Sequence, residues 1–220
     1  MKRHLKLTGV ALLMAGAALG IQPLQAQGGY VAGDFHQHTT YTDGSYTIGK
    51  MMEMNNYYGL DWWANSEHGG GFSTWGLVTG IDLGTSVAWA NTGIALKGKS
   101  NPGKMWRWQS IQDWSYRDVQ LWRRIFLDKL ILQGYEMNVP GHEHASTCII
   151  SNQFDEESNA DPIAQFEYMF DNSDTDDSQP NGWVKSTKTG HAKAVEAVAW
   201  LQANYPTTSW VIPAHPERYV

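Results

Sequence analysis

Tyr30-Val31-Ala32-Gly33-Asp34-Phe35-His36-Gln37-His38 is the stretch from which the fold of this chain is predicted. Residues 30–35 have the pattern of a strand that runs into a pair of histidines. Residues 47–58 then carry apolar side chains at helical spacing, and Gly59 is placed to end that helix. A second strand is expected over residues 60–64. This order of strand, helix and strand predicts a parallel α/β sheet, in which sites form at the carboxyl ends of the strands.

The same signals predict further elements along the chain. We expect helices over residues 110–127, 163–170 and 189–204, and strands over residues 130–135, 145–151 and 210–214. Eight of the 11 tryptophans fall between residues 62 and 122, so residues from about 69 to 129 are predicted to form a Trp-rich insertion. We expect these tryptophans to pack its core, with a lid or a stacking platform for substrate as the alternative.

The first 26 residues have the features of a signal peptide. Lys2, Arg3 and Lys6 precede an apolar run from Leu7 to Ile21, and Leu24-Gln25-Ala26 fits a cleavage site. The apolar run is shorter than the ~20 residues of a membrane-spanning helix, so no stable membrane insertion is expected. Residues 27–220 would then be the mature domain, located in the periplasm or secreted.

Composition limits the classes of partner and of stabilising bond. The 220 residues carry a formal charge of −6, and removing the signal peptide would take away three positive charges and no negative ones. An acidic domain of this kind is not expected to bind a nucleic acid duplex. The single cysteine, Cys148, permits no intrachain disulfide, and its apolar neighbours predict a buried strand and not a reactive thiol. Bound metal is another source of stability.

Histidine placement is the strongest functional signal in the chain. Four histidines come at or just after predicted strand ends, namely His36, His38, His68 and His215, and two more, His142 and His144, lie in the loop between the third and fourth strands. His191 stands apart, near the start of a helix. His36 and His38 face the same side of an extended segment, so one strand end presents two imidazoles. Together with the carboxylates of Asp43, Glu67 and Glu136, this set predicts a metal site.

These motifs resemble those of the Polymerase and Histidinol Phosphatase (PHP) superfamily of metal-dependent phosphoesterases. The matching segments, which span residues 33–216, are Asp34-Phe35-His36-Gln37-His38-Thr39 with Thr42-Asp43-Gly44, Gly59-Leu60-Asp61 with Ser66-Glu67-His68, Gly134-Tyr135-Glu136, and Ala214-His215-Pro216. The resemblance implies a distorted (β/α)7 TIM-like barrel. Only about five strands are predicted here, and nothing after His215 supplies the Asp-x-His pair with which the family ends. We therefore expect a barrel that is incomplete at the C-terminus.

The resemblance also implies the roles of individual residues at a site with two or three Zn, Mn or Fe ions. His36, His38 and Glu136 would hold one ion, and Glu136 would bridge to a second ion held by His68 and the loop that carries His142 and His144. Either of these two histidines fits the family's motif. Asp43 and His215 would serve a third position, and Glu136 and His215 are the expected catalytic residues. The family more often has Asp where this chain has Glu67, so Glu67 receives no ligand role.

The expected function is hydrolysis of a small-molecule phosphoester by a hydroxide that bridges the ions. A metal-dependent amide or lactone hydrolase is an alternative, because the same nucleophile attacks carbonyl groups. A non-catalytic periplasmic protein that binds a carbohydrate or aromatic ligand through its tryptophans is another. We expect the basic side chains of Lys104, Arg107, Arg117, Arg123 and Arg124 to form a solvated helix face, with pairing to a substrate phosphate as the alternative.

Overall fold

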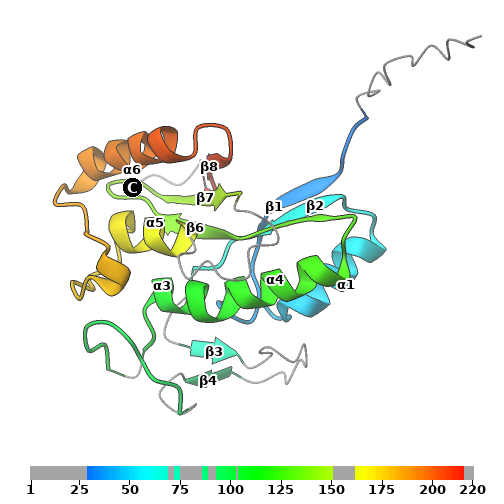
Figure 1. Ribbon diagram of the computed structural model, residues 1–220, viewed down its shortest axis with the longest axis horizontal. Helices are drawn as coiled ribbons and strands as arrows, with labels where there is room; N and C mark the ends of the chain where they lie inside the picture. Colours follow the sequence, from blue (N-terminus) through cyan, green and yellow to red (C-terminus); the bar gives the residue numbers. More distant parts are fainter. Residues whose placement is uncertain are drawn as a thin grey trace, which may run out of the picture. The chain divides into compact units, whose positions relative to one another are not determined.

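Two three-stranded sheets organise the part of the chain that the structure, a computed structural model, describes (Figure 1). The described residues are 29–68, 72–74, 86–88, 93–102, 104–150 and 162–215. The predicted signal peptide, residues 1–26, lies outside them. So do Trp75 and Trp89 of the predicted insertion and Pro216 of the last motif.

The first sheet is parallel and has the order β1-β2-β5. Its strands are β1 (Gly33–Gln37), β2 (Trp62–Asn65) and β5 (Leu130–Leu132), and α1 (Ile48–Tyr57) connects β1 to β2. The side chain of Thr47 caps α1 by accepting a hydrogen bond from the backbone N–H of Lys50 at 3.1 Å. Gly59 follows the helix with φ of +78°, a conformation that favours glycine. The predicted strand, helix and strand at the start of the domain are confirmed.

The next helical segment begins before its predicted start. It consists of α3 (Arg107–Ser110), the π-helical segment η2 (Ile111–Ser115) and α4 (Tyr116–Ile125), of which α4 covers this sheet together with α1. The buried side chains between α1, α4 and the sheet are Tyr41, Ile48, Met52, Trp63, Val119 and Ile131. Arg123 is also buried, and its Nε donates to the carbonyl oxygen of Ile131 at 2.7 Å. The prediction that Arg123 is solvated was therefore wrong.

The second sheet is antiparallel, and it shows that the predicted barrel was wrong. Its strands are β6 (Gly134–Asn138), β7 (His144–Ile149) and β8 (Ser209–Pro213), in the order β6-β7-β8. In a (β/α) barrel every strand returns parallel to the one before, which takes a crossover of about a dozen residues or more. Residues 139–143 are too few for that, so β7 turns back beside β6. The described residues form no closed barrel.

The two sheets meet where β5 passes into β6, which the sequence predicted as one strand. The backbone N–H of Gly134 donates to the side-chain oxygen of Asn65 at 2.9 Å. A Cβ atom at Gly134 would lie 2.4 Å from the carbonyl oxygen of Asn65 and 3.0 Å from that of Thr147. Only glycine allows this approach, because β6 is enclosed by the backbones of β2 and β7 at this point.

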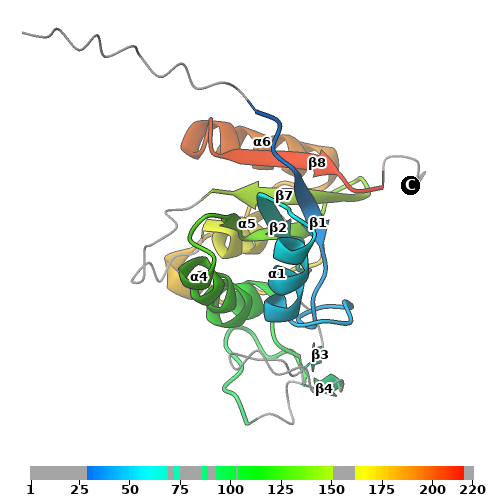
Figure 2. The ribbon, with the colours of Figure 1, turned by 90° about the vertical axis from the view of Figure 1, so that its right-hand side faces the viewer.

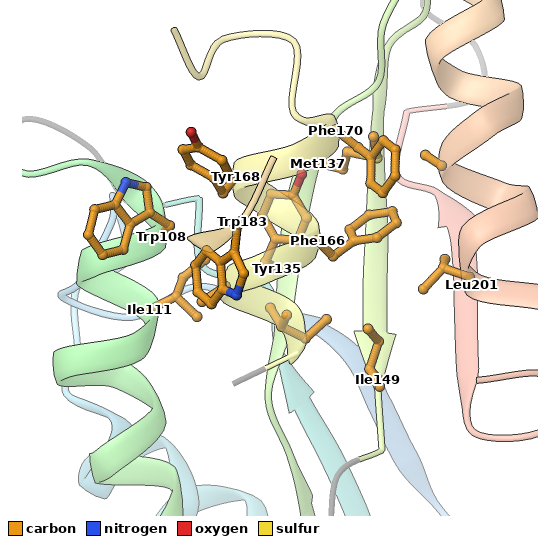
Figure 3. Close-up of a cluster of buried hydrophobic side chains, with 13 residues drawn as sticks. Trp108, Ile111, Tyr135, Met137, Ile149, Phe166, Tyr168, Phe170, Trp183 and Leu201 are labelled. Carbon is orange, nitrogen blue, oxygen red and sulfur yellow. The ribbon is translucent and has the colours of Figure 1, made fainter. Parts of the chain in front are cut away.

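Helices α3, α5 (Pro162–Phe170) and α6 (Gly190–Asn204) pack with the second sheet around the largest apolar cluster (Figure 3). The side chains labelled in Figure 3 are Trp108, Ile111, Tyr135, Met137, Ile149, Phe166, Tyr168, Phe170, Trp183 and Leu201. Helix α6 lies along β8 (Figure 2). A smaller cluster of Ala64, Leu132 and Cys148 joins the two sheets. The predicted burial of Cys148 is thus confirmed.

Short elements complete the described chain. Strands β3 (Phe72–Thr74) and β4 (Ser86–Ala88) form an antiparallel pair within the predicted Trp-rich insertion, and η3 (Pro180–Gly182) is a 3-10 turn. Trp108, in the same insertion, is buried in the large cluster, as core packing requires. None of the helices in the described ranges combines the length and the apolar composition that crossing a membrane requires.

The junction between the sheets gives a prediction about stability. Gly134→Ala adds a methyl group between two backbones, so the free energy of unfolding is expected to fall by about 1–3 kcal/mol. Urea denaturation followed by circular dichroism measures this change. Gly29→Ala is the matched control, because a Cβ there meets nothing within 4 Å. Equal stability of the two variants would contradict the close approach at Gly134.

Candidate metal centre

One edge of the two sheets collects the predicted ligands. Strands β1, β2 and β6 end at this edge, and Ala214 and His215 follow the end of β8 there. Strand β7 runs the other way, so it contributes its first residue, His144, which pairs with Asn138 at the end of β6. The backbone N–H of Ala214 donates to the carbonyl oxygen of His144 at 2.9 Å, which places His215 beside it.

Three overlapping groups at this edge could hold a metal ion. They are His36, His38 and Glu136; His38, Asp43 and His68; and Glu136, His144 and His215. In each group one ligand atom per residue lies within 4.8 Å of the others. His38 and Glu136 each belong to two groups, so both can lie between neighbouring ions. Seven of the eight predicted metal ligands are brought together in this way.

Glu136 is the centre of this arrangement. Its Oε1 lies 3.2 Å from Nδ1 of His144, 3.3 Å from Nε2 of His215 and 4.0 Å from Nε2 of His36. Its Oε2 lies 3.5 Å from Nε2 of His38. Four imidazoles thus face the two oxygens of a single carboxylate whose side chain is only 6% exposed.

The nitrogen and oxygen atoms of these side chains are arranged better for contact with a cation than for hydrogen bonds with one another. Oε1 of Glu136 is buried and has no hydrogen-bond partner among the described residues. Nε2 of His36 and Nε2 of His38 face each other at 2.8 Å. Burial lowers the pKa of both imidazoles, more than the nearby Glu136 raises it, which favours the neutral form that binds metals.

A tight turn brings Asp43 back over the end of β1. The backbone N–H groups of Thr42 and Gly44 both donate to the carbonyl oxygen of Thr39 at 3.0 Å. A Cβ at Gly44 would lie 2.3 Å from the carbonyl oxygen of His38, so this position requires glycine. Oδ1 of Asp43 then lies 3.1 Å from Nε2 of His68 and 3.3 Å from Nδ1 of His38.

The electrostatics of Asp43 match a ligand role. Burial raises the pKa of its carboxyl group. His68 and, to a smaller extent, His38 lower the pKa by more than burial raises it, so the net pKa is below the usual range. The carboxylate is therefore ionised at neutral pH. A charged oxygen beside two imidazole nitrogens suits a divalent transition metal.

Side chains outside the three groups orient the ligands. Nδ1 of His36 hydrogen bonds to the hydroxyl of Ser146, which lies opposite Glu136 in the register of β6 and β7. Gln37 points the other way and exchanges two amide hydrogen bonds with Asn55 of α1, at 2.7 and 2.9 Å. The sequence analysis missed Ser146, although its spacing of two from His144 in a strand puts both side chains on one face.

Glu67 lies beside the groups without belonging to them. Its carboxyl group is buried and accepts a hydrogen bond from the hydroxyl of Thr39, and burial raises its pKa to about 7. Its carbonyl oxygen accepts a hydrogen bond from the backbone N–H of Glu136 at 3.1 Å. Glu67 therefore holds Glu136 in place through the backbone.

The structure separates the two histidines of the loop between β6 and β7. His144 belongs to the group of Glu136 and His215, whereas His142 belongs to none of the three groups. Nε2 of His142 instead lies 3.0 Å from Nδ1 of His191, at the start of α6. His191, which stands apart from the other histidines in the sequence, thus has His142 as its partner.

A cavity of about 440 Å³ opens onto the metal groups. Its lining residues are His38, Asp43, His68, Arg107, Glu136, Asn138, His144 and His215. Arg107 comes from the start of α3, and its Nη1 lies 3.4 Å from Oδ2 of the buried Asp171. The expectation of a solvated helix face was therefore wrong for Arg107 too. No local pattern in the sequence indicates that Arg107 and Asn138 reach this cavity.

Comparisons of the chain with models of protein families, with curated proteins and with solved structures found no match. Its function is therefore inferred from the geometry of the cavity and of the three metal groups.

The placement of the loop histidines predicts different effects of two matched substitutions. His144→Ala is expected to raise the Kd for Zn²⁺ by at least about 10–100-fold, because it removes a donor that faces Glu136. His142→Ala is expected to leave that Kd within about twofold. Competition with a chromogenic chelator measures both values. The reverse order would assign the ligand role to His142.

Ser146 gives a second prediction. Ser146→Ala removes the hydrogen bond that orients His36, so the Kd for Zn²⁺ is expected to rise by about 10–100-fold. Ser209→Ala, at the far end of β8, is the control, since its hydroxyl only donates to the carbonyl oxygen of Tyr205. Unchanged affinity in Ser146→Ala would show that the contact does not orient the ligand.

Proposed function

We propose that this chain is an exported metal-dependent phosphoesterase of the PHP type. The observation that carries the proposal is the buried carboxylate of Glu136, shared by two histidine groups in a cavity that Arg107 also lines. A shared carboxylate suits closely spaced cations, and a guanidinium suits an anionic substrate. The predicted signal peptide would direct the protein to the periplasm or out of the cell.

The three groups of residues would hold two or three divalent ions. The mixed imidazole and carboxylate donors suit Zn, Mn or Fe. When bound, such ions would lower the pKa of a water molecule toward about 7, and they would neutralise charge on a phosphoryl group. Glu136 and His38, each shared by two groups, would set the spacing between the ions.

Arg107 favours a phosphoester over a carbonyl substrate. A guanidinium group matches two phosphoryl oxygens at once, and it is always charged. The ion pair with Asp171 restrains the guanidinium group of Arg107 as substrate enters. An amide or lactone carries no comparable charge and would gain less from this side chain.

His215 would transfer a proton. Its Nε2 lies 3.3 Å from Oε1 of Glu136, and its side chain is the most exposed of the four imidazoles around that carboxylate, at 40%. An imidazole on the open side of the cavity can take up a proton from solvent and donate it to the leaving oxygen. Glu136 would orient this ring while it holds the ions.

The test uses the mature chain after reconstitution with Zn²⁺, Mn²⁺ or Fe²⁺. At least one equivalent of metal is expected, together with hydrolysis of phosphomonoesters or phosphodiesters that a chelator abolishes and added metal restores. Glu136→Gln is expected to lower kcat/KM by at least about 100-fold. Arg107→Ala is expected to raise KM for phosphoesters more than Arg107→Lys does, because lysine keeps the charge but not the paired contacts.

Three results would overturn the proposal. Less than one equivalent of bound metal after reconstitution would remove the basis of the chemistry. Hydrolysis of lactones or amides alone, with no phosphoester cleaved, would reassign the same metal groups to carbonyl substrates. Metal bound without any hydrolysis, and a ligand bound near the tryptophans, would indicate a binding protein.

A further inference from the structure

A second cavity, of about 300 Å³, adjoins the metal cavity at one side chain. Arg107 lines both. The other lining residues of the second cavity are Asn101, Lys104, Met105, Trp106, Glu167, Ser173 and Asp174. Its volume is at the lower end of the range of about 300–1,000 Å³ for small-molecule sites. A substrate whose phosphoryl group contacts Arg107 from the metal side therefore has space for its organic part on the other side.

The second cavity has buried carboxyl oxygens that lack hydrogen-bond donors among the described residues. Glu167 is 0% exposed, and among the described residues neither of its carboxyl oxygens has a hydrogen-bond partner; Oδ2 of Asp174 has none either. Burial raises the pKa of both groups. A proton shared between them would satisfy only part of this set. The remaining oxygens are free to contact a ligand in the cavity.

A neighbouring carboxylate, that of Asp176, has several hydrogen-bond donors, so their absence is specific to the oxygens of Glu167 and Asp174. Asp176 accepts hydrogen bonds from the backbone N–H of Lys99 at 2.8 Å, from Nε1 of Trp108 at 2.9 Å and from the hydroxyl of Ser178 at 2.9 Å. Asp176 is thus part of the framework. Glu167, only nine residues away along the chain, faces the cavity without such support.

Charge decides which kind of ligand fits. Nζ of Lys185 lies 3.0 Å from Oδ1 of Asp174, and Lys104 and Arg107 line the cavity. These cations disfavour a ligand with an ammonium group. A hydroxyl group adds no charge. Because it both donates and accepts hydrogen bonds, it matches the carboxyl groups of Glu167 and Asp174 whether or not a proton lies between them. Met105 and Trp106 supply an apolar wall for carbon atoms between the hydroxyls.

We propose that the second cavity is the subsite for a polyhydroxylated leaving group, so that the substrate is the phosphoester of a polyol or sugar. This inference rests on the proposed phosphoesterase function. Arg107 contacts the phosphoryl group at the boundary of the two cavities, and Glu167 and Asp174 accept hydroxyl donors at the far end. Removing those hydroxyls leaves buried polar groups unpaired, which makes such a site selective.

The test compares glycerol 1-phosphate with propyl phosphate, which has the same carbon chain without the two free hydroxyls. The metal-loaded wild-type protein is expected to favour glycerol 1-phosphate by about tenfold or more in kcat/KM. Glu167→Gln keeps the shape of the side chain but changes its hydrogen-bonding groups, and the preference is expected to fall toward one. Glu53→Gln, at an exposed position of α1, is the matched control and is expected to keep the preference.

The outcomes separate the two proposals. Equal kcat/KM for both esters in the wild type, or an unchanged preference in Glu167→Gln, would overturn the subsite and leave the phosphoesterase function standing. Hydrolysis of neither ester would count against the function. In that case saturation-transfer NMR with glycerol 1-phosphate still tests the subsite: binding that Glu167→Gln weakens supports it, and binding that is absent or equal in both proteins rejects it.

Discussion

The buried carboxylate of Glu136 is the constraint on which the rest of the site depends. An ionised carboxylate removed from water costs far more than the net stability of a domain unless it is compensated. Here the groups that face it are imidazoles whose neutral form burial favours, at least for His36 and His38. Neutral rings supply little positive charge. Cations between the rings and the carboxylate would satisfy both sets of atoms, which would explain why so many nitrogens point inward at one oxygen pair.

The fold delivers Glu136 to that position through backbone contacts on both sides. Its N–H is held by the carbonyl oxygen of Glu67 from the first sheet, and β7 pairs with it in the second. Asp171 extends this support, since it accepts hydrogen bonds from the Tyr135 hydroxyl at 3.0 Å and the Asn138 N–H at 2.8 Å. The same carboxylate pairs with Arg107. Arg107 and Glu136 are therefore anchored to one framework.

The sequence predicted the histidine site better than the fold around it, for a physical reason. A side chain at the carboxyl end of a strand reaches the edge of its sheet whatever the strand pairs with, so His36, His38 and His68 converge as expected. An antiparallel strand reaches the same edge with its first residue, so His144 takes its place although the barrel was wrong. Strand direction depends on tertiary pairing that single-strand patterns do not contain. Arg107 was expected on a solvated helix face, because the packing of α3 that turns it inward is not contained in the local pattern.

Metal binding at this edge would also hold the two sheets together. His36 and His38 come from the first sheet, whereas Glu136 comes from the second, so an ion held by all three bridges the junction at Gly134. The chain has one cysteine and no intrachain disulfide to do this. A ligand that binds only the folded state adds about 2.7 kcal/mol at a concentration 100 times its Kd. The proposed metal ligands would thus stabilise the fold that positions them, and loss of the ions would destabilise that fold.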